Sequence, residues 1–159
     1  METKAPSIQQ EIRQGQPFGT AAQEAAVALL RTADVVRRRV AKGMEPFGIT
    51  PQQFNVLRIL RGAGDKPLPT LEIAERMVEQ APGITRLLDR IEARGWVKRV
   101  RCTEDRRQVL CSITPEGLEL LARMDETVGR SDGASIGELS ETELRQLLDM
   151  LATVRATGY

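Results

Sequence analysis

The sequence predicts a mainly α-helical domain that contains one small β-hairpin. Helical periodicity recurs along most of the chain, while "WVKRVRC" and "QVLCSI" are apolar and β-branched enough for two strands, joined by the charged "TEDRR". A short helix, a turn and a second helix are expected immediately before this hairpin. That order of elements is typical of a winged helix-turn-helix, and we expect this fold over about residues 49–114.

The N-terminal part predicts an arm followed by one long helix. Residues 1–18 hold two prolines and a glycine around "SIQQEIRQ", which favours a loose arm with two helical turns. From Thr20 to about Lys42, apolar residues recur at spacings of three and four, as on one face of an amphipathic helix. We therefore expect residues 19–159 to form a single domain that follows the arm.

Start and stop signals delimit the helices of the central unit. Thr50 and Pro51 predict a capped helix start, and Thr70 is expected to cap a short helix after the turn "DKPLP". Three apolar residues of that short helix are expected to face inward: Leu71, Ala74 and Met77. The next helix is expected over about residues 81–94, with Gly95 as its C-terminal cap.

Two more amphipathic helices are predicted in the C-terminal part. The first starts at Thr114 and Pro115, and "GRSDGASIG" then breaks its periodicity with three glycines. The second follows a capping box formed by Ser140 and Glu143. The apolar stripes of these helices and of the long first helix exceed what the central unit can cover. We expect these helices to cover one another, within or between chains.

Composition restricts the classes of function. The net charge is only +1, yet residues 76–107 hold nine Arg/Lys and five Asp/Glu, a local net charge of +4 that favours an anionic partner. Histidine is absent and two cysteines make a poor zinc site. We therefore expect that the protein is not an enzyme and that it holds no cofactor or metal. No apolar run could span a bilayer and no signal peptide begins the chain, which predicts a cytoplasmic protein without a membrane partner.

The helix that starts near Pro82 is expected to carry a cationic outward face. At about 100° per residue, three apolar side chains fall on an inward face: Leu87, Leu88 and Ile91. Four polar ones fall outward: Thr85, Arg86, Asp89 and Arg90. Pro82 suits a first helical turn, and Gly83 would let a phosphate or base edge approach the backbone. Because arginine can bond guanine in bidentate fashion, this helix start could enter a groove of DNA; a solvated face explains it equally well.

The hairpin shifts the balance between these two interpretations. "TEDRR" places Arg106 and Arg107 at a tip beside Asp105, which could hold an arginine side chain in position. A charged tip is usually a solvated turn, but a tip arginine also suits the narrow minor groove. Two basic elements from one small unit, one for each groove, favour double-stranded DNA as the partner.

Four ordered segments resemble the MarR family of bacterial transcription regulators: "GITPQQFNVLRIL", "GITRLLDRIEARGWVKR", "EDRRQVLCSITPEG" and "LSETELRQLLDML". The resemblance covers about residues 20–156 and implies a homodimer, with dimerisation helices at about 19–43 and 115–156. It implies DNA contacts at Gln80, Pro82, Gly83, Thr85 and Arg86, with Arg90 nearer the backbone. It also implies that Arg107 enters the minor groove and that Asp105 braces it.

The function implied is a sequence-specific regulator, a repressor that binds a pseudo-palindromic operator as a homodimer. Many relatives release DNA when a small aromatic acid or phenolic effector binds, and four arginines offer charge near that region: Arg31, Arg37, Arg58 and Arg61. The alternative is a winged-helix protein–protein interaction module that does not bind DNA. An apolar wing tip would favour that alternative.

Three departures from the family pattern affect these expectations. Ala81, Pro82 and Gly83 stand where relatives usually have Ser, Thr or Asn, so Arg86 and the backbone must supply more of the contacts. The glycine-rich segment predicts a kinked or frayed dimer helix. No cysteine precedes Cys102, which argues against the thiol-based peroxide sensing of some relatives.

The two cysteines have separate predicted positions. Cys111 alternates with Val109 and Ile113 and is expected on the buried face of a strand. Cys102 lies near the base of the wing. The two thiols would face each other only if Arg106 and Arg107 were the loop of a two-residue hairpin, and only that register would permit a disulfide that locks the wing.

Overall fold

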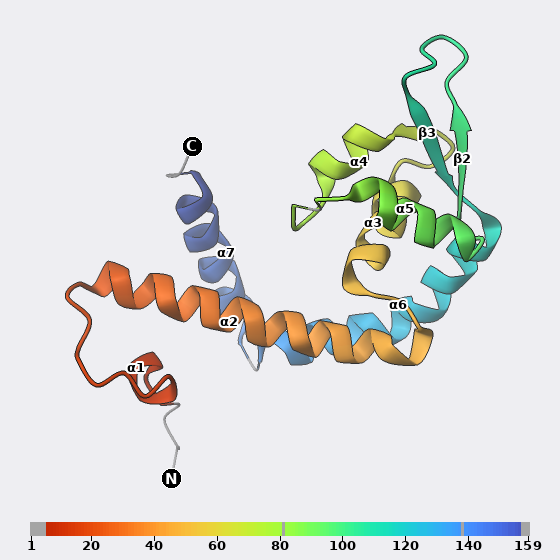
Figure 1. Cartoon of the computed structure of the whole chain (residues 1–159). Helices are drawn as coiled ribbons and strands as arrows, with labels where there is room; N and C mark the ends of the chain where they lie inside the picture. Colours follow the sequence, from red (N-terminus) through yellow and green to blue (C-terminus); the bar gives the residue numbers. More distant parts are fainter. Residues whose placement is uncertain (1–5, 81, 138, 157–159) are drawn as a thin grey trace. The chain divides into compact units, whose positions relative to one another are not determined.

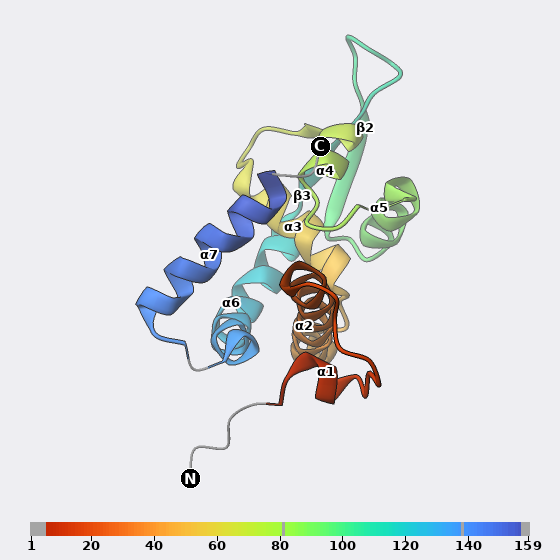
Figure 2. The same cartoon turned by 90° about the vertical axis from the view of Figure 1, so that its left-hand side faces the viewer.

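The structure is a computed structural model that describes residues 6–80, 82–137 and 139–156, with the backbone alone at 126–135. The chain forms two compact units, Met1–Arg39 and Val40–Tyr159. Figures 1 and 2 show a mostly helical chain with one small sheet, and the predicted order of helices and hairpin is confirmed.

The first unit consists of a one-turn helix and most of a long one. Helix α1 spans Ile8–Glu11, one turn rather than the two predicted, and a capping box between Ser7 and Gln10 starts it. Helix α2 spans Ala21–Met44 and so continues into the second unit. Arg31 donates from Nε to Glu11 Oε1 over 2.8 Å, which ties the N-terminal segment to α2.

Helices α3, α4 and α5 form the helical part of the central unit. After the 3-10 turn η1 (Glu45–Phe47), α3 spans Pro51–Gly62, α4 spans Thr70–Arg76 and α5 spans Ile84–Ala93. The predicted cap of α3 is confirmed, because Thr50 Oγ1 accepts from Gln53 N–H at 3.3 Å and Gln53 Oε1 accepts from Thr50 N–H at 3.0 Å. This reciprocal pair satisfies two backbone donors at the helix start.

The sheet has three antiparallel strands in the order β1-β3-β2. Strands β2 (Val97–Arg101) and β3 (Val109–Ile113) form the predicted hairpin, and the short β1 (Leu68–Pro69) pairs with β3. The prediction of a plain turn at "DKPLP" was therefore incomplete. Proline is tolerated in β1 because this is an edge strand. Thr70 is the first residue of α4 rather than its cap, and its hydroxyl donates to the Val109 carbonyl of β3 at 3.3 Å.

One hydrophobic core joins these helices to the sheet and to the start of α6. Its buried residues are Met44, Ile49, Phe54, Val56, Leu57, Leu60, Leu68, Ile73, Leu87, Leu88, Ile91, Val97, Cys111, Leu120, Leu121 and Met124. In α4 the inward face was predicted only in part: Met77 packs against the core and Ala74 is half-buried, but Leu71 is 71% exposed, and the fully buried Ile73 was missed. A helix of two turns gives too few positions to fix its periodicity, so the packing against α3 and the sheet decides which side faces in.

Two helices complete the chain. Helix α6 spans Pro115–Ile136 and α7 spans Glu141–Ala156. Arg61 of α3 and Asp125 of α6 form an ion pair at 2.8 Å. The backbone of α6 stays helical through two glycines of "GRSDGASIG" and the helix ends only at Gly137, whose φ is 87°; the kink predicted for this segment stays a prediction. About 1 kcal/mol per interior glycine does not outweigh the helical hydrogen bonds on both sides. No helix of the described residues has the length and apolarity needed to cross a membrane.

Candidate nucleic-acid interface

Helix α5 separates an apolar face from a charged one as predicted. Leu87, Leu88 and Ile91 are at most 3% exposed and pack in the core. Thr85, Arg86, Asp89 and Arg90 are all exposed on the opposite side. The burial of three large apolar side chains, each stabilising by about 1.5–3 kcal/mol, fixes the rotation of α5 and therefore the direction of its arginines.

The start of α5 differs from the prediction. Pro82 and Gly83 form a turn before the helix instead of its first residues, and Gly83 is the N-cap with φ 95° and ψ 33°. This left-handed conformation is accessible to glycine and unfavourable for residues with a Cβ. It interrupts the helix, so Pro82 cannot belong to the first turn. Ala81 lies outside the described residues.

The space at Gly83 is nevertheless open, as expected. Among the described residues, a Cβ built there would meet no heavy atom within 4 Å, and no side chain caps the helix. The first N–H groups of α5 consequently have no side-chain acceptor. Unsatisfied N–H groups at a helix start, together with the positive end of the helix dipole, favour an anion.

A hydrogen bond to α3 anchors the segment that connects α4 to α5. The N–H of Val78 donates to Asn55 Oδ1 of α3 at 2.8 Å. Gln80, which the resemblance assigned to the DNA contact, is exposed in this connection. The hydrogen bond that Asn55 accepts therefore fixes the chain two residues before Gln80, a contribution that the sequence did not predict.

The wing loop projects beyond α4 and α5, as both views show (Figures 1 and 2). Arg106 and Arg107 form its turn and are exposed. Asp105 Oδ1 accepts from the N–H of Arg107 at 3.0 Å, and its Oδ2 accepts from Gln108 Nε2 at 3.2 Å. Asp105 thus supports Arg107 through its backbone; among the described residues its carboxylate holds no arginine side chain.

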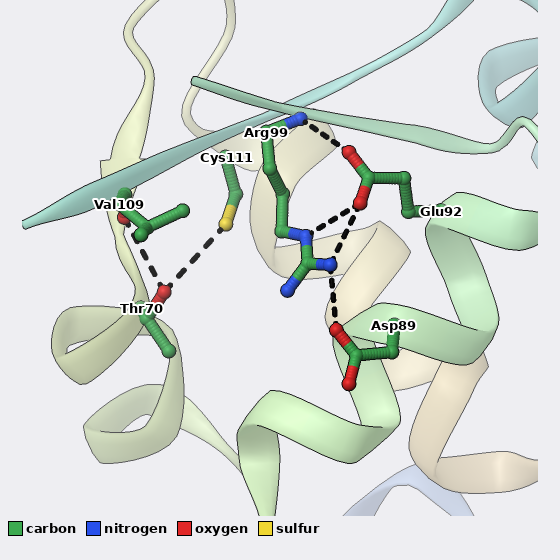
Figure 3. Close-up of polar contacts among 6 residues, drawn as sticks. All are labelled: Thr70, Asp89, Glu92, Arg99, Val109 and Cys111. Atoms are coloured by element: carbon green, nitrogen blue, oxygen red, sulfur yellow. Dashed lines mark hydrogen bonds and ion pairs between the residues drawn. The ribbon is translucent and has the colours of Figure 1, made fainter. Parts of the chain in front are cut away.

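Arg99 connects the wing to α5 (Figure 3). Its Nε donates to Glu92 Oε2 at 2.8 Å, and its Nη2 lies 2.6 Å from Asp89 Oδ1 and 2.7 Å from Glu92 Oε2. The N–H of Arg99 also donates to Glu92 Oε1 at 3.0 Å. These bonds to Glu92 and Asp89 raise the pKa of Arg99 further above its ordinary value, against the lowering effect of its partial burial. The guanidinium is therefore always charged.

Sequence reasoning missed this bridge, although a signal was available. Residues alternate along a strand, and Val97 is buried, so Arg99 must also point inward. An inward arginine requires acidic partners, because an unpaired buried charge is costly. Asp89 and Glu92, three residues apart on one side of α5, are suitable partners.

The hairpin register separates the two cysteines. Cys111 lies opposite Arg99, whereas Cys102 pairs with Gln108 beyond the end of the ladder. Three residues along a strand span roughly 10 Å, which is beyond the reach of a disulfide. The register that would allow a wing-locking bond is therefore contradicted. The predicted burial of Cys111 is confirmed, and burial raises the pKa of its thiol.

The four arginines that were considered for an effector all have partners within the chain. Arg31 pairs with Glu11 and Arg61 with Asp125, both at 2.8 Å. Arg37 lies 3.6 Å from Asp34, and Arg58 stands 5.7 Å from the centre of the Phe54 ring. An acidic effector would have to compete with these interactions.

The predicted site residues thus form two groups within one compact unit. Gln80, Pro82, Gly83, Thr85, Arg86 and Arg90 lie along the start and outer face of α5, and Asp105, Arg106 and Arg107 lie at the wing tip. The bridge through Arg99 links the element that carries the first group to the strand that leads to the second. The two groups are separate surfaces on a common support.

Comparisons with known proteins agree on the family. The MarR family model matches residues 49–109. The chain is 36% identical over 86 residues to the uncharacterized HTH-type transcriptional regulator YwoH of Bacillus subtilis, covering 54% of this chain and 61% of that protein. It is 37% identical over 82 residues to the HTH-type transcriptional repressor MdtR of the same organism, covering 52% of each. The matched parts thus span only about half to three fifths of these relatives.

Solved structures extend the match over nearly the whole fold. The crystal structure of a MarR transcription factor from Planctomyces limnophilus shares 36% identity and a TM-score of 0.67, covering 86% of this chain and 99% of that one. A MarR mutant from E. coli complexed with operator DNA shares 24% identity and a TM-score of 0.77, over 87% of this chain and 99% of that one. At this identity the match establishes that the two chains share a fold and nothing more. The chain has a winged helix-turn-helix and four sequence segments in the order that the family has them. Together with these matches, this shows that the chain belongs to the MarR family.

Proposed function

We propose that the protein is a transcriptional regulator that binds double-stranded DNA, with α5 in the major groove and the wing in an adjacent minor groove. One observation carries the proposal. Four exposed arginines on these two elements form no ion pair with any described residue: Arg86, Arg90, Arg106 and Arg107. Their charges need no rearrangement before they meet phosphates or base edges.

The contrast with other arginines of the same unit supports this interpretation. Arg61, Arg76, Arg99 and Arg145 each pair with a carboxylate. A paired arginine must give up its partner to bind a phosphate, whereas an unpaired one only releases counterions. The open N–H groups at the start of α5 add a second favourable feature for a phosphate. The E. coli neighbour in complex with operator DNA has the same fold.

The proposal includes a homodimer that binds a pseudo-palindromic operator. Helix α7 has no buried residue in the single chain, and Leu148 and Met150 are 62% and 60% exposed. Exposed apolar side chains of this size favour burial against another surface, and a second copy supplies one. Two winged units related by a twofold axis would contact half-sites about 34 Å apart. Light scattering should give twice the chain mass, with Leu148→Glu shifting the mass toward a monomer.

The proposal also includes repression and control by a small aromatic or phenolic effector, as the family resemblance implies. The repressor MdtR is one relative whose name records that direction of control. An effector carboxylate near α3 would compete with Asp125 for Arg61, which is paired at 2.8 Å. A titration with aromatic acids and phenols should release bound DNA. Unchanged DNA affinity across the series would contradict this part of the proposal.

The central experiment is a selection of duplexes from genomic fragments, followed by binding titrations at several salt concentrations. Each phosphate contact should contribute about −0.9 to the slope of log affinity against log salt. Arg86→Gln combined with Arg107→Gln should reduce the steepness of that slope, while the control Arg145→Gln removes a charge from α7 and should leave it unchanged. Absence of salt-dependent binding by the parent protein would reject DNA binding and favour the protein–protein interaction module.

A further inference from the structure

The wing and α5 carry separate groups of arginines, so their relative position must be fixed before one duplex can meet both. The covalent connection between them runs through Arg94, Gly95 and Trp96, a tight turn in which Gly95 has φ 75°. Two further kinds of contact join α5 to β2. Val97 makes apolar contacts in the core, and Arg99 forms a polar bridge to Asp89 and Glu92. We propose that Arg99 is a positioning residue that sets the angle of the wing on α5, and so controls DNA binding without touching the duplex. This inference rests on the proposed function.

The geometry of Arg99 suits a bridge better than a DNA contact. Its side chain is 20% exposed, and its Nε and Nη2 are both engaged by carboxylates. Glu92 is held twice, once by the side chain and once by the backbone N–H of Arg99. A planar guanidinium that binds two carboxylates and is anchored through its own backbone resists rotation, which a single-point contact would not.

A small change at Arg99 is enlarged at the wing tip. Strand β2 ends at Arg101 and the wing loop continues to Asp105, so the tip lies at most roughly 20 Å beyond Arg99 at about 3.3 Å per residue. A rotation of about 10° at Arg99 would then move the tip by up to about 3 Å, a whole hydrogen-bond length. The displaced tip would keep its cations and still attract any duplex, but it could meet the minor groove only if α5 shifted away from its own base contacts. Loss of the bridge should consequently reduce discrimination between duplexes more than it reduces general attraction to DNA.

The bridge also affects charge, and the experiment must separate the two effects. Asp89 is 53% exposed on the same outward face as Arg86 and Arg90, where its carboxylate repels phosphates. Arg99 offsets this repulsion. Removing Arg99 therefore lowers the attraction for any duplex, whereas removing Asp89 raises it. A positioning role predicts that both changes reduce discrimination despite these opposite charge effects.

The first test compares Arg99→Gln with Lys98→Gln, which removes the same charge from an exposed neighbour on the opposite face of β2. Affinities are measured by fluorescence anisotropy for a selected duplex and for a scrambled one. Arg99→Gln should lower the ratio of the two affinities about tenfold, since charge-assisted bonds to two carboxylates are lost. Lys98→Gln should change the ratio by less than about twofold, as expected for an exposed charge. Equal ratios in the two variants would overturn the inference.

Asp89→Asn provides a second variant whose exposed position keeps folding intact. It should bind the scrambled duplex more tightly than the parent does, yet show a smaller affinity ratio. An unchanged or larger ratio would mean that Asp89 acts through charge alone and would overturn the positioning role.

Hydrogen exchange of the free protein tests the bridge without DNA. In Arg99→Gln the amides of residues 97–108 should exchange faster than in Lys98→Gln, while those of α3 remain unchanged. Equal exchange in the two variants would overturn the bridge even if DNA binding were established. A parent protein without salt-dependent duplex binding would instead reject the proposed function, and the DNA role of Arg99 with it.

Discussion

Gly117→Ala tests how closely α6 packs against Trp96, the residue that immediately precedes β2. Gly117 is a buried residue in the first turn of α6, and Thr114 Oγ1 accepts from its N–H at 3.1 Å. A Cβ at this position would lie 2.4 Å from the Trp96 carbonyl oxygen and 2.9 Å from Ile113 Cγ1. The nearest obstacle is backbone, so no rotation of a flexible side chain can relieve the clash. Either α6 or the start of β2 must move.

The magnitude follows from three contributions. Overpacking of a close-packed site costs typically about 1–3 kcal/mol. Movement of Trp96 also stretches the hydrogen bond that its carbonyl accepts from Thr114 N–H at 3.0 Å, which removes about 1 kcal/mol. Alanine offsets about 1 kcal/mol through its better helix propensity. The free energy of unfolding should therefore fall by about 1–3 kcal/mol, which at this chain length lowers Tm by roughly 2–4 °C per kcal/mol.

Urea denaturation at a fixed protein concentration measures this effect, because a concentration change would also shift an oligomer. Gly62→Ala is the matched control, since a Cβ at Gly62 meets no heavy atom within 4 Å at the end of α3. It should leave stability unchanged or raise it by up to about 1 kcal/mol. If Gly117→Ala matched Gly62→Ala in stability, the close approach of α6 to Trp96 would be wrong.

The remaining predictions concern the wing, α5 and the cysteines. Arg86→Ala should cost about 1–3 kcal/mol of binding and relax sequence choice, while Arg107→Ala should weaken binding to every duplex; gel-shift titrations with selected and scrambled duplexes distinguish the two patterns. Asp105→Ala should weaken binding although it removes a negative charge, because the turn loses its bond to the Arg107 N–H; tighter binding in the same titration would contradict this. Cys111 should resist iodoacetamide in the native protein, since it is buried and its pKa is raised, whereas the half-buried Cys102 should react; mass spectrometry that found both thiols alkylated at equal rates would refute the difference.

Helical periodicity was sufficient to predict the inner face of α5, but the start of this helix could not be predicted. Over ten residues, three apolar side chains at matching angles leave one orientation that buries them all. At the start, proline is compatible both with a first helical turn and with the turn before it. The choice depends on the left-handed conformation of Gly83, which a glycine in a sequence permits but does not specify.

Elements that depend on a partner far along the chain were the hardest to predict. Leu68 and Pro69 form a strand only because β3 lies beside them, and the segment itself has the composition of a turn. Arg99 faces Cys111 only in the register that this wing loop imposes. A shift of one residue would turn every side chain of β2 to the other face. Loop length, which sets the register, is not determined by strand composition.

The net charge of +4 over residues 76–107 understates the charge that the site offers to DNA. Carboxylates of this segment are engaged within the fold: Asp89 and Glu92 by Arg99, and Asp105 by N–H groups of the wing loop. Hydrogen bonds to N–H groups and to a guanidinium spread the charge of these carboxylates and weaken their field at a phosphate. Of the nine cations, Arg76 and Arg99 are held in ion pairs. The acidic residues of the segment therefore position the arginines more than they neutralise them, and this division of roles follows from the pairing in the structure rather than from the count of charges.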